Sequence, residues 1–233
     1  MRRIIGVLLL VVAALSGCDG GQDNGASPQA SPSPTISIVP DIDPGILTAE
    51  PSLTEDFSAG PSGWTGGAVR AGRFAVSVPN GRDLGFAVAP ERIAPGSTGV
   101  FLQARIDMPR RGRAGLFCRR SPDGRGGYAV IFDPAAGAWE VLRLERDEPE
   151  HVRGEALRPE VVRPGEDAFV RMLCGTGEPG EPVTIAFTIN SSGLLGARDE
   201  SALAVAGTST AGVVVEGRGD RVRFDDVSLT LGE

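Results

Sequence analysis

Short apolar runs that alternate with polar residues fill the chain after residue 52, and they predict β-strands. Residues 183–189 (VTIAFTI), 100–108 and 74–78 alternate cleanly. Successive side chains of a strand point to opposite faces, so this period of two is typical of strands with one buried face. Weaker forms of the pattern predict further strands at residues 53–57, 84–88, 114–120, 128–132, 139–144, 169–174, 211–216 and 222–231.

Helices are not expected in this part of the chain. No window keeps a helical period, and the 33 glycines and 18 prolines are poorly tolerated in helix interiors. About eleven short strands in roughly 180 residues favour one sandwich of two sheets over two domains. In the last strand the alternation changes phase at Asp225 and Asp226, which predicts a β-bulge there.

The N-terminus has the pattern of an export signal. Arg2 and Arg3 precede twelve apolar residues (4–15), fewer than the roughly 20 that span a bilayer. The sequence LSGC at 15–18 resembles the lipobox of bacterial lipoprotein precursors. This resemblance implies cleavage after residue 17, a lipid on Cys18 and a location on the extracytoplasmic face of the cell membrane. The alternative is an ordinary cleaved signal with a chance cysteine.

Residues 18–52 are rich in Gly, Ser and Pro and cannot bury a core. We therefore divide the chain into a lipoprotein signal peptide (1–17), a lipid anchor with a disordered linker (18–52) and a β-sandwich domain (53–233). Removal of residues 1–17 takes away two arginines and no acids, which changes the formal charge from -7 to -9. Nucleic acid is an unsuitable partner for so acidic a protein.

Three cysteines are an odd number for an exported protein. If Cys18 carries lipid, Cys118 and Cys174 remain as a pair, and the oxidising compartment favours a disulfide between them. The alternative is a zinc site, which the lack of a CxxC spacing and the single histidine, His151, disfavour.

Three stretches together carry a second resemblance: EDFS at 55–58 leading to Gly-Trp at 63–64, the cysteine pair, and VRFDDV at 222–227. They resemble concanavalin A-like, laminin-G-like jelly-roll domains of bacterial surface proteins over about residues 53–231. The resemblance implies an all-β sandwich of two antiparallel sheets, with the first and last strands side by side. Many relatives have an Asn-Gly turn near the later strands, whereas Asn190 is followed here by two serines.

The family also includes glycoside hydrolases, whose carboxylates follow patterns such as Glu-x-Asp-x-x-Glu on one strand. Glu145, Asp147 and Glu150 have this spacing. A retaining enzyme needs two such carboxyl groups about 5–5.5 Å apart. Pro149 and the polar neighbours instead predict a solvated loop. His151 has no Gly-x-Ser-x-Gly elbow beside it that would suggest a serine hydrolase.

Candidate binding residues come from three other patterns. Five arginines without an acid among them could hold an anionic polymer or a lipid phosphate, or form a solvated hairpin: Arg110, Arg111, Arg113, Arg119 and Arg120. Tyr128 and Trp139 could stack on a sugar or pack in the core. Three carboxylates could form a partial site for structural Ca²⁺ or be solvated at strand edges: Asp56, Asp225 and Asp226.

The sequence therefore supports two functional hypotheses. The favoured one is a membrane-anchored, non-catalytic recognition or scaffolding sandwich that contacts envelope glycans or surface proteins. The alternative is a glycoside hydrolase that uses Glu145, Asp147 and Glu150.

Overall fold

The computed structural model describes residues 44–60, 63–80, 82–124, 126–145, 148–158, 160–176, 182–190, 192–200, 207–217 and 221–232. The predicted signal peptide, Cys18 and most of the linker lie outside these residues. Within them, no helix is long and apolar enough to cross a membrane. The elements are η1 (Pro44–Leu47), β1 (Leu53–Glu55), β2 (Gly67–Arg70), β3 (Arg73–Val76), β4 (Leu84–Val88), β5 (Gly99–Asp107), β6 (Arg113–Arg120), β7 (Tyr128–Asp133), β8 (Ala138–Glu145), β9 (Glu148–Ala156), β10 (Asp167–Thr176), β11 (Val183–Ile189), β12 (Leu195–Asp199), β13 (Thr210–Glu216) and β14 (Val222–Leu231).

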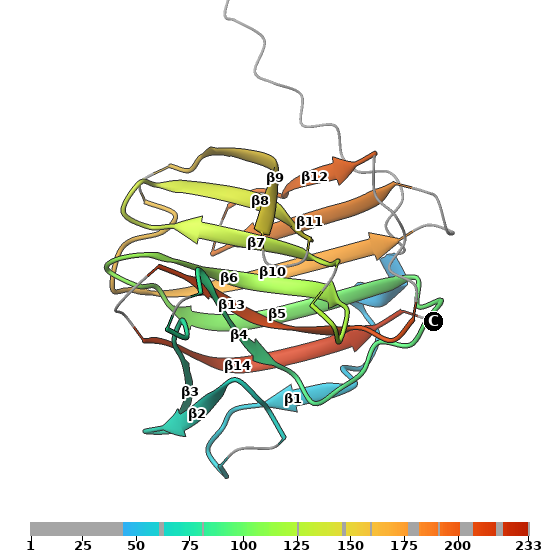
Figure 1. Cartoon of the computed structure of the whole chain (residues 1–233), viewed down its shortest axis with the longest axis horizontal. Helices are drawn as coiled ribbons and strands as arrows, with labels where there is room; N and C mark the ends of the chain where they lie inside the picture. The colour runs from blue at the N-terminus through green and yellow to red at the C-terminus, as the bar shows by residue number, and fades with distance from the viewer. Residues whose placement is uncertain are drawn as a thin grey trace, which may run out of the picture. The chain divides into compact units, whose positions relative to one another are not determined.

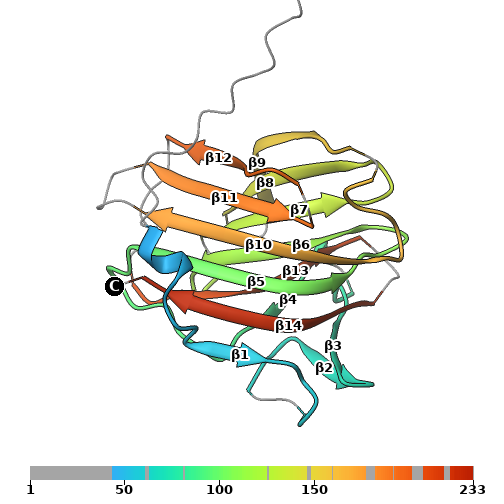
Figure 2. The same ribbon diagram turned by 180° about the vertical axis from the view of Figure 1, so that it is seen from behind.

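The strands form two antiparallel sheets that face each other (Figures 1 and 2). The eight-stranded sheet has the order β12-β11-β10-β5-β14-β3-β2, with β1 also paired to β14. The six-stranded sheet has the order β4-β13-β6-β7-β8-β9. This arrangement confirms the predicted all-β jelly-roll sandwich.

The two ends of the domain meet in the eight-stranded sheet. Leu53 of β1 is paired with Leu229 of β14, so the first and last strands lie side by side as expected. The register between β14 and β5 shifts between Asp225 and Ser228, and Asp226 has a φ of 48°. The bulge predicted from the change of phase is therefore present.

The motifs behind the fold resemblance converge in the core. Phe57 and Trp64 from the opening stretch pack on Phe224 from the closing stretch, with ring centroids 5.5 and 5.4 Å apart. Phe74 of β3 completes this buried aromatic cluster. Aromatic pairs at such distances stabilise a core beyond the area that they bury. The aromatic residues that carry the resemblance at the two ends of the domain thus have a packing role.

A disulfide joins the two sheets. Cys118 of β6 and Cys174 of β10 are bonded, 56 positions apart in sequence, and both are fully buried. Because β6 and β10 belong to different sheets, the bond closes the sandwich as a covalent tie. The predicted pairing is confirmed.

Three strands were not predicted, and all three lie at sheet edges: β2, β9 and β12. Each pairs with one neighbour only, and β9 contains a single large aliphatic residue, Val152. The expectation of a solvated loop at residues 145–150 is wrong, because β8 and β9 form a hairpin there. An edge strand tolerates Pro149, since a backbone N–H that faces solvent is not needed for pairing.

The packed domain also begins earlier than the predicted boundary at residue 53. Ile46 of η1 is buried and packs with Leu173, Ala186 and the partly buried Phe101. Figure 2 shows η1 lying over the outer face of the eight-stranded sheet. One apolar residue in a Pro-rich stretch gave no period from which this contact could be predicted.

Candidate functional site

The outer face of the six-stranded sheet carries an apolar cluster of its own, separate from the core between the sheets. Its buried members are Phe117, Ala129, Ile131, Leu142, Leu144 and Val214, with Leu84, Phe86 and Val88 partly buried against them. The central strands β6 and β7 are therefore apolar on both faces. This explains the nearly continuous apolar run of residues 128–132, which is typical of a strand with neighbours on both sides.

A row of three charged side chains crosses this face. Arg113 of β6 contacts Glu140 of β8 at 2.5 Å and Glu216 of β13 at 2.5 Å. Since β7 lies between β6 and β8, the guanidinium spans that strand to reach Glu140. The three side chains keep 24%, 34% and 22% of their surface exposed, so they form a fixed but accessible polar row.

The electrostatics of the row favour the charged state of its arginine. Burial alone would lower the pKa of Arg113, but hydrogen bonds to Glu216 and Glu140 outweigh it and raise the pKa. The carboxylates keep lone pairs that are not used by Arg113. The row can therefore both donate and accept hydrogen bonds without moving.

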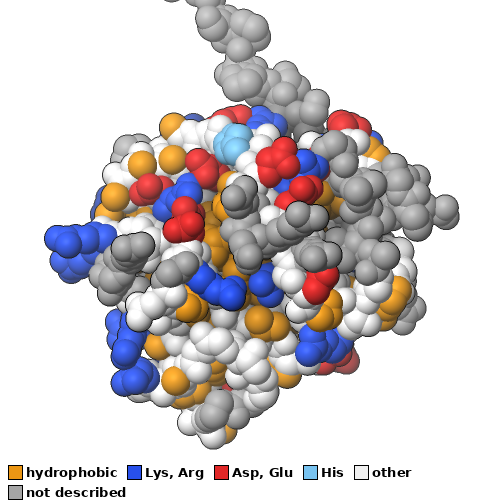
Figure 3. All heavy atoms as spheres, in the orientation of Figure 1, with side chains coloured by type: hydrophobic (Ala, Val, Ile, Leu, Met, Phe, Trp, Pro, Cys, Tyr) orange, Lys and Arg blue, Asp and Glu red, His pale blue; other side chains and the backbone are white. Residues whose placement is uncertain are grey.

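At the other end of β6, Arg120 lies over the ring of Phe86, 4.2 Å from its centroid. A guanidinium over an aromatic face at this distance is a cation–π contact. Figure 3 shows apolar side chains on this face between arginines and carboxylates. The face combines apolar surface with a few oriented polar groups.

The five arginines predicted as one cluster do not gather in space. Arg110 and Arg111 lie in the turn before β6, Arg113 starts the strand, and Arg119 and Arg120 end it. An eight-residue strand separates its ends by about 23 Å. Arg113 is also neutralised by two carboxylates. These arginines are close in sequence but not in space, because an extended strand places its two ends far apart.

Tyr128 and Trp139 are not exposed sugar platforms. Both are buried in the core between the sheets, and the Trp139 ring lies 4.9 Å from that of Phe187. The Tyr128 hydroxyl donates a hydrogen bond to Asp199 at 2.9 Å. Burial raises the pKa of Tyr128, and this hydrogen bond raises it further. Of the two alternatives for these residues, core packing is correct.

The carboxylates of the hydrolase hypothesis do not form an array on one strand. Glu145 ends β8 and Glu150 lies in β9, and both form ion pairs with Arg143. Their side chains are 60% and 56% exposed. Asp147 lies outside the described residues. The described pair therefore surrounds an arginine at a hairpin end.

Asp56, Asp225 and Asp226 each contact other residues of the chain. Asp56 accepts hydrogen bonds from the backbone N–H and the hydroxyl of Ser58, and Asp226 pairs with Arg105 at 2.8 Å. Burial raises the pKa of Asp225, which makes its charged form less favourable. In the part of the chain that the structure describes, no group of three or more His, Cys, Asp or Glu side chains could hold a metal ion.

No protein-family model and no curated protein sequence matches this chain. Its fold is similar to that of solved lectins. The metal-free form of lectin I-B4 from Griffonia simplicifolia aligns over 78% of this chain and 99% of its own, with 11% identity and a TM-score of 0.55. The lectin from Bauhinia forficata in complex with GalNAc aligns over 78% and 97%, with 13% identity and a TM-score of 0.53. The chain therefore has the lectin-type jelly-roll fold.

Proposed function

We propose that this protein is a non-catalytic glycan-recognition module, held on the extracytoplasmic face of the cell membrane by a lipid on Cys18. The observation that carries the recognition role is the row Glu216–Arg113–Glu140 on the outer face of the six-stranded sheet. The partly buried members of the apolar cluster beside it provide the second element of such a site.

The chemistry of sugars matches this combination. A pyranose ring presents C–H groups on its faces and hydroxyls at its edges, and each hydroxyl both donates and accepts a hydrogen bond. Carboxylates accept from hydroxyls and the guanidinium donates to them, and the partly buried Leu84, which is paired with Glu216, offers apolar contact. Because the ion pairs already hold the polar groups in place, little side-chain freedom is lost on binding.

The fold neighbours support the same class of ligand. Both aligned proteins are lectins, and one is in complex with GalNAc. Hydrolysis has no comparable support, because Glu145 and Glu150 lie on neighbouring strands and pair with Arg143.

The anchor is supported by the lipobox-like LSGC at 15–18 and by the cysteine count. Cys118 and Cys174 are bonded to each other, which leaves Cys18 as the unpaired cysteine. Cell fractionation tests the proposal: Cys18→Ala should move the protein from the membrane to the soluble fraction. Retention of the variant in the membrane would contradict lipid anchoring.

A glycan array of the Cys18→Ala protein tests the recognition role, with Arg113→Met as the site variant. We expect binding to a defined set of glycans, and its loss in Arg113→Met. Arg171→Met is the matched control, since Arg171 is an arginine of the eight-stranded sheet that lies over the ring of Phe169. Absence of glycan binding, or binding that Arg113→Met leaves unchanged, would overturn the proposal.

A further inference from the structure

Arg119 is a buried cation, and this sets it apart from the other arginines that the structure describes. Among the described residues only two charged side chains are buried, Arg119 and Asp199, each 5% exposed. Asp199 has partners for its charge: Arg143 at 3.0 Å and the Tyr128 hydroxyl at 2.9 Å. Within the described part of the chain, Arg119 has no such counter-charge.

A bulge in β6 brings Arg119 into the sandwich. Thr210 of β13 is paired with Arg120, but Gly212 is paired with Phe117, so one extra residue is accommodated between them. Arg119 has a φ of 53°, in the left-handed region. Phe117 packs on the outer face and Cys118 in the inner core, and the bulge then turns Arg119 inward as well. Bulges commonly re-aim a side chain in this way.

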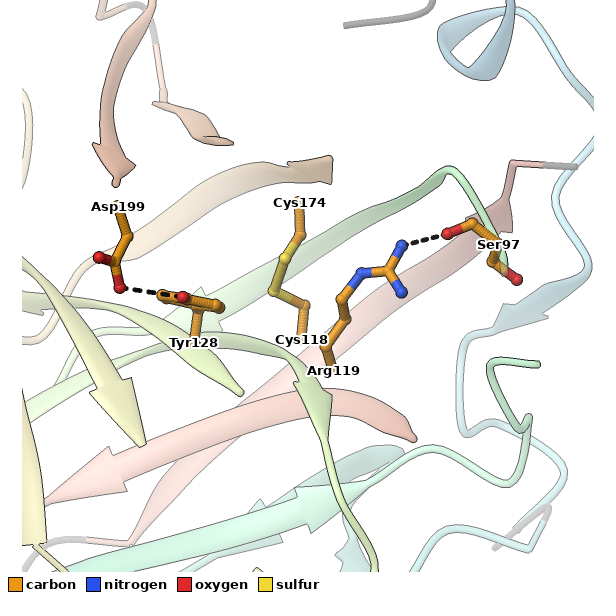
Figure 4. The surroundings of a disulfide bond; sticks show 6 residues. All are labelled: Ser97, Cys118, Arg119, Tyr128, Cys174 and Asp199. Carbon is orange, nitrogen blue, oxygen red and sulfur yellow. Dashed lines mark hydrogen bonds between the residues drawn. A yellow bond between two sulfur atoms is a disulfide. The ribbon is translucent and has the colours of Figure 1, made fainter. Parts of the chain in front are cut away.

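Figure 4 shows the Arg119 side chain between the disulfide and Ser97. One terminal nitrogen of the guanidinium donates to the Ser97 carbonyl oxygen. The Nε atom is buried and has no hydrogen-bond partner. Burial, with no carboxylate acting against it, lowers the pKa of Arg119 to about 10. The group therefore remains charged at neutral pH, with its charge uncompensated by described residues.

Two features of Arg119 are energetically unfavourable. An unpaired buried charge is strongly unfavourable, and a left-handed conformation is unfavourable for a residue with a side chain. Such costs are typical of sites that become complete when a ligand binds. A guanidinium fork matches the two oxygens of a carboxylate or a phosphate.

We propose that Arg119 is an anion-binding site, which accepts the oxyanion group of a ligand through the guanidinium fork that lacks a carboxylate partner. The ligand group is a carboxylate or a phosphate. Because only 5% of Arg119 is exposed, a small oxyanion group suits it better than a flat sugar ring. It is separate from the Arg113 row, and it goes beyond the proposed glycan recognition.

Calorimetric titration of the detergent-solubilised full chain tests this proposal, with sodium glucuronate and sodium phosphate as separate probes. Sodium chloride keeps the ionic strength constant, so general screening does not differ between samples. We expect saturable binding of at least one probe. Arg119→Met should weaken it by roughly tenfold or more, because a hydrogen bond to a charged group contributes at least that factor.

Arg120→Met is the matched control, because Arg120 is the adjacent arginine but lies over Phe86 on the outer face. It should leave anion binding unchanged, as should Arg113→Met. Binding of glucuronate alone identifies a carboxylate ligand, and binding of phosphate alone identifies a phosphate ligand. Absence of binding for both probes, or unchanged binding in Arg119→Met, would overturn the proposal.

Arg119→Lys keeps the charge but removes the fork, and it serves if Arg119→Met does not fold. Its circular dichroism spectrum should match that of the wild type, while its anion affinity falls. If both variants unfold, Arg119 supports the fold rather than a ligand, and the proposal is wrong. If an Arg119 variant loses anion binding but still binds glycans, Arg119 and the Arg113 row are two different sites.

Discussion

Two buried charged side chains, Asp199 and Arg119, lie on either side of the disulfide (Figure 4). They differ in whether the charge has a partner among the described residues. Asp199 of β12 meets Tyr128 of β7 and Arg143 of β8, so its hydrogen bonds join the eight-stranded sheet to the six-stranded one. Arg119 contacts a backbone carbonyl and leaves its Nε unpartnered. Equal burial therefore does not mean an equal role: the paired charge ties the sheets together, and the unpaired one is the residue that we propose binds an anion.

The disulfide between the two charges should have the largest effect on stability. Replacement of Cys118 and Cys174 by alanine should lower the free energy of unfolding by about 4 kcal/mol, since the bond closes a long loop in the unfolded chain. Urea unfolding followed by fluorescence measures it. Cys18→Ala is the control and should leave the midpoint unchanged. A loss below about 1 kcal/mol would mean that this end of the sandwich is held together without the covalent tie.

Asp199→Asn should have the next largest effect. It keeps the shape of the side chain but removes the charge that Arg143 and the Tyr128 hydroxyl contact. Loss of one partner of a buried ion pair costs about 3 kcal/mol. Glu200→Gln is the control, because Glu200 pairs with Arg198 in an exposed position, where the effect stays below about 1 kcal/mol. Equal midpoints for the two variants in urea would show that Asp199 does not join the sheets.

Arg119→Met should have the smallest effect, and its sign distinguishes the two charges. Methionine is apolar and of similar length, and it replaces an uncompensated buried charge. The replacement should leave the free energy of unfolding unchanged or raise it by about 1 kcal/mol. The measurement is urea unfolding in a buffer without carboxylate or phosphate. A loss as large as that of Asp199→Asn would mean that the Ser97 contact makes Arg119 a structural residue.

The interior of the fold could be predicted from the sequence, because strands such as β5 alternate and the doubly covered β7 is a short continuous apolar run. Even the bulge at Asp225 and Asp226 was visible as a change of phase. The edge strands β2, β9 and β12 gave no such signal, since an edge needs little apolar surface. The cysteine count predicted the Cys118–Cys174 bond, which depends on composition and compartment more than on pattern.

The candidate sites were much harder to predict. Arg113 was named as a binding residue, but its partners Glu140 and Glu216 are 27 and 103 positions away. Only the strand order β13-β6-β7-β8 brings them together. Arg119 and Arg120 point to different sides because of a bulge, which is seen in the pairing of β6 with β13 and in the φ of Arg119 but not in the sequence. The pairing of strands that are distant in sequence therefore determines which side chains meet at a site. This pairing could not be predicted from one sequence.

The central claim is that the outer face of the six-stranded sheet binds a glycan. Hydrogen–deuterium exchange with a bound glycan tests this claim most directly. The measurement compares the Cys18→Ala protein with and without a glycan selected on the array. We predict slower exchange in β6, β8 and β13, which carry Arg113, Glu140 and Glu216, and unchanged exchange in β5, β10 and β14. Protection confined to the eight-stranded sheet, or no protection in either sheet, would contradict the account.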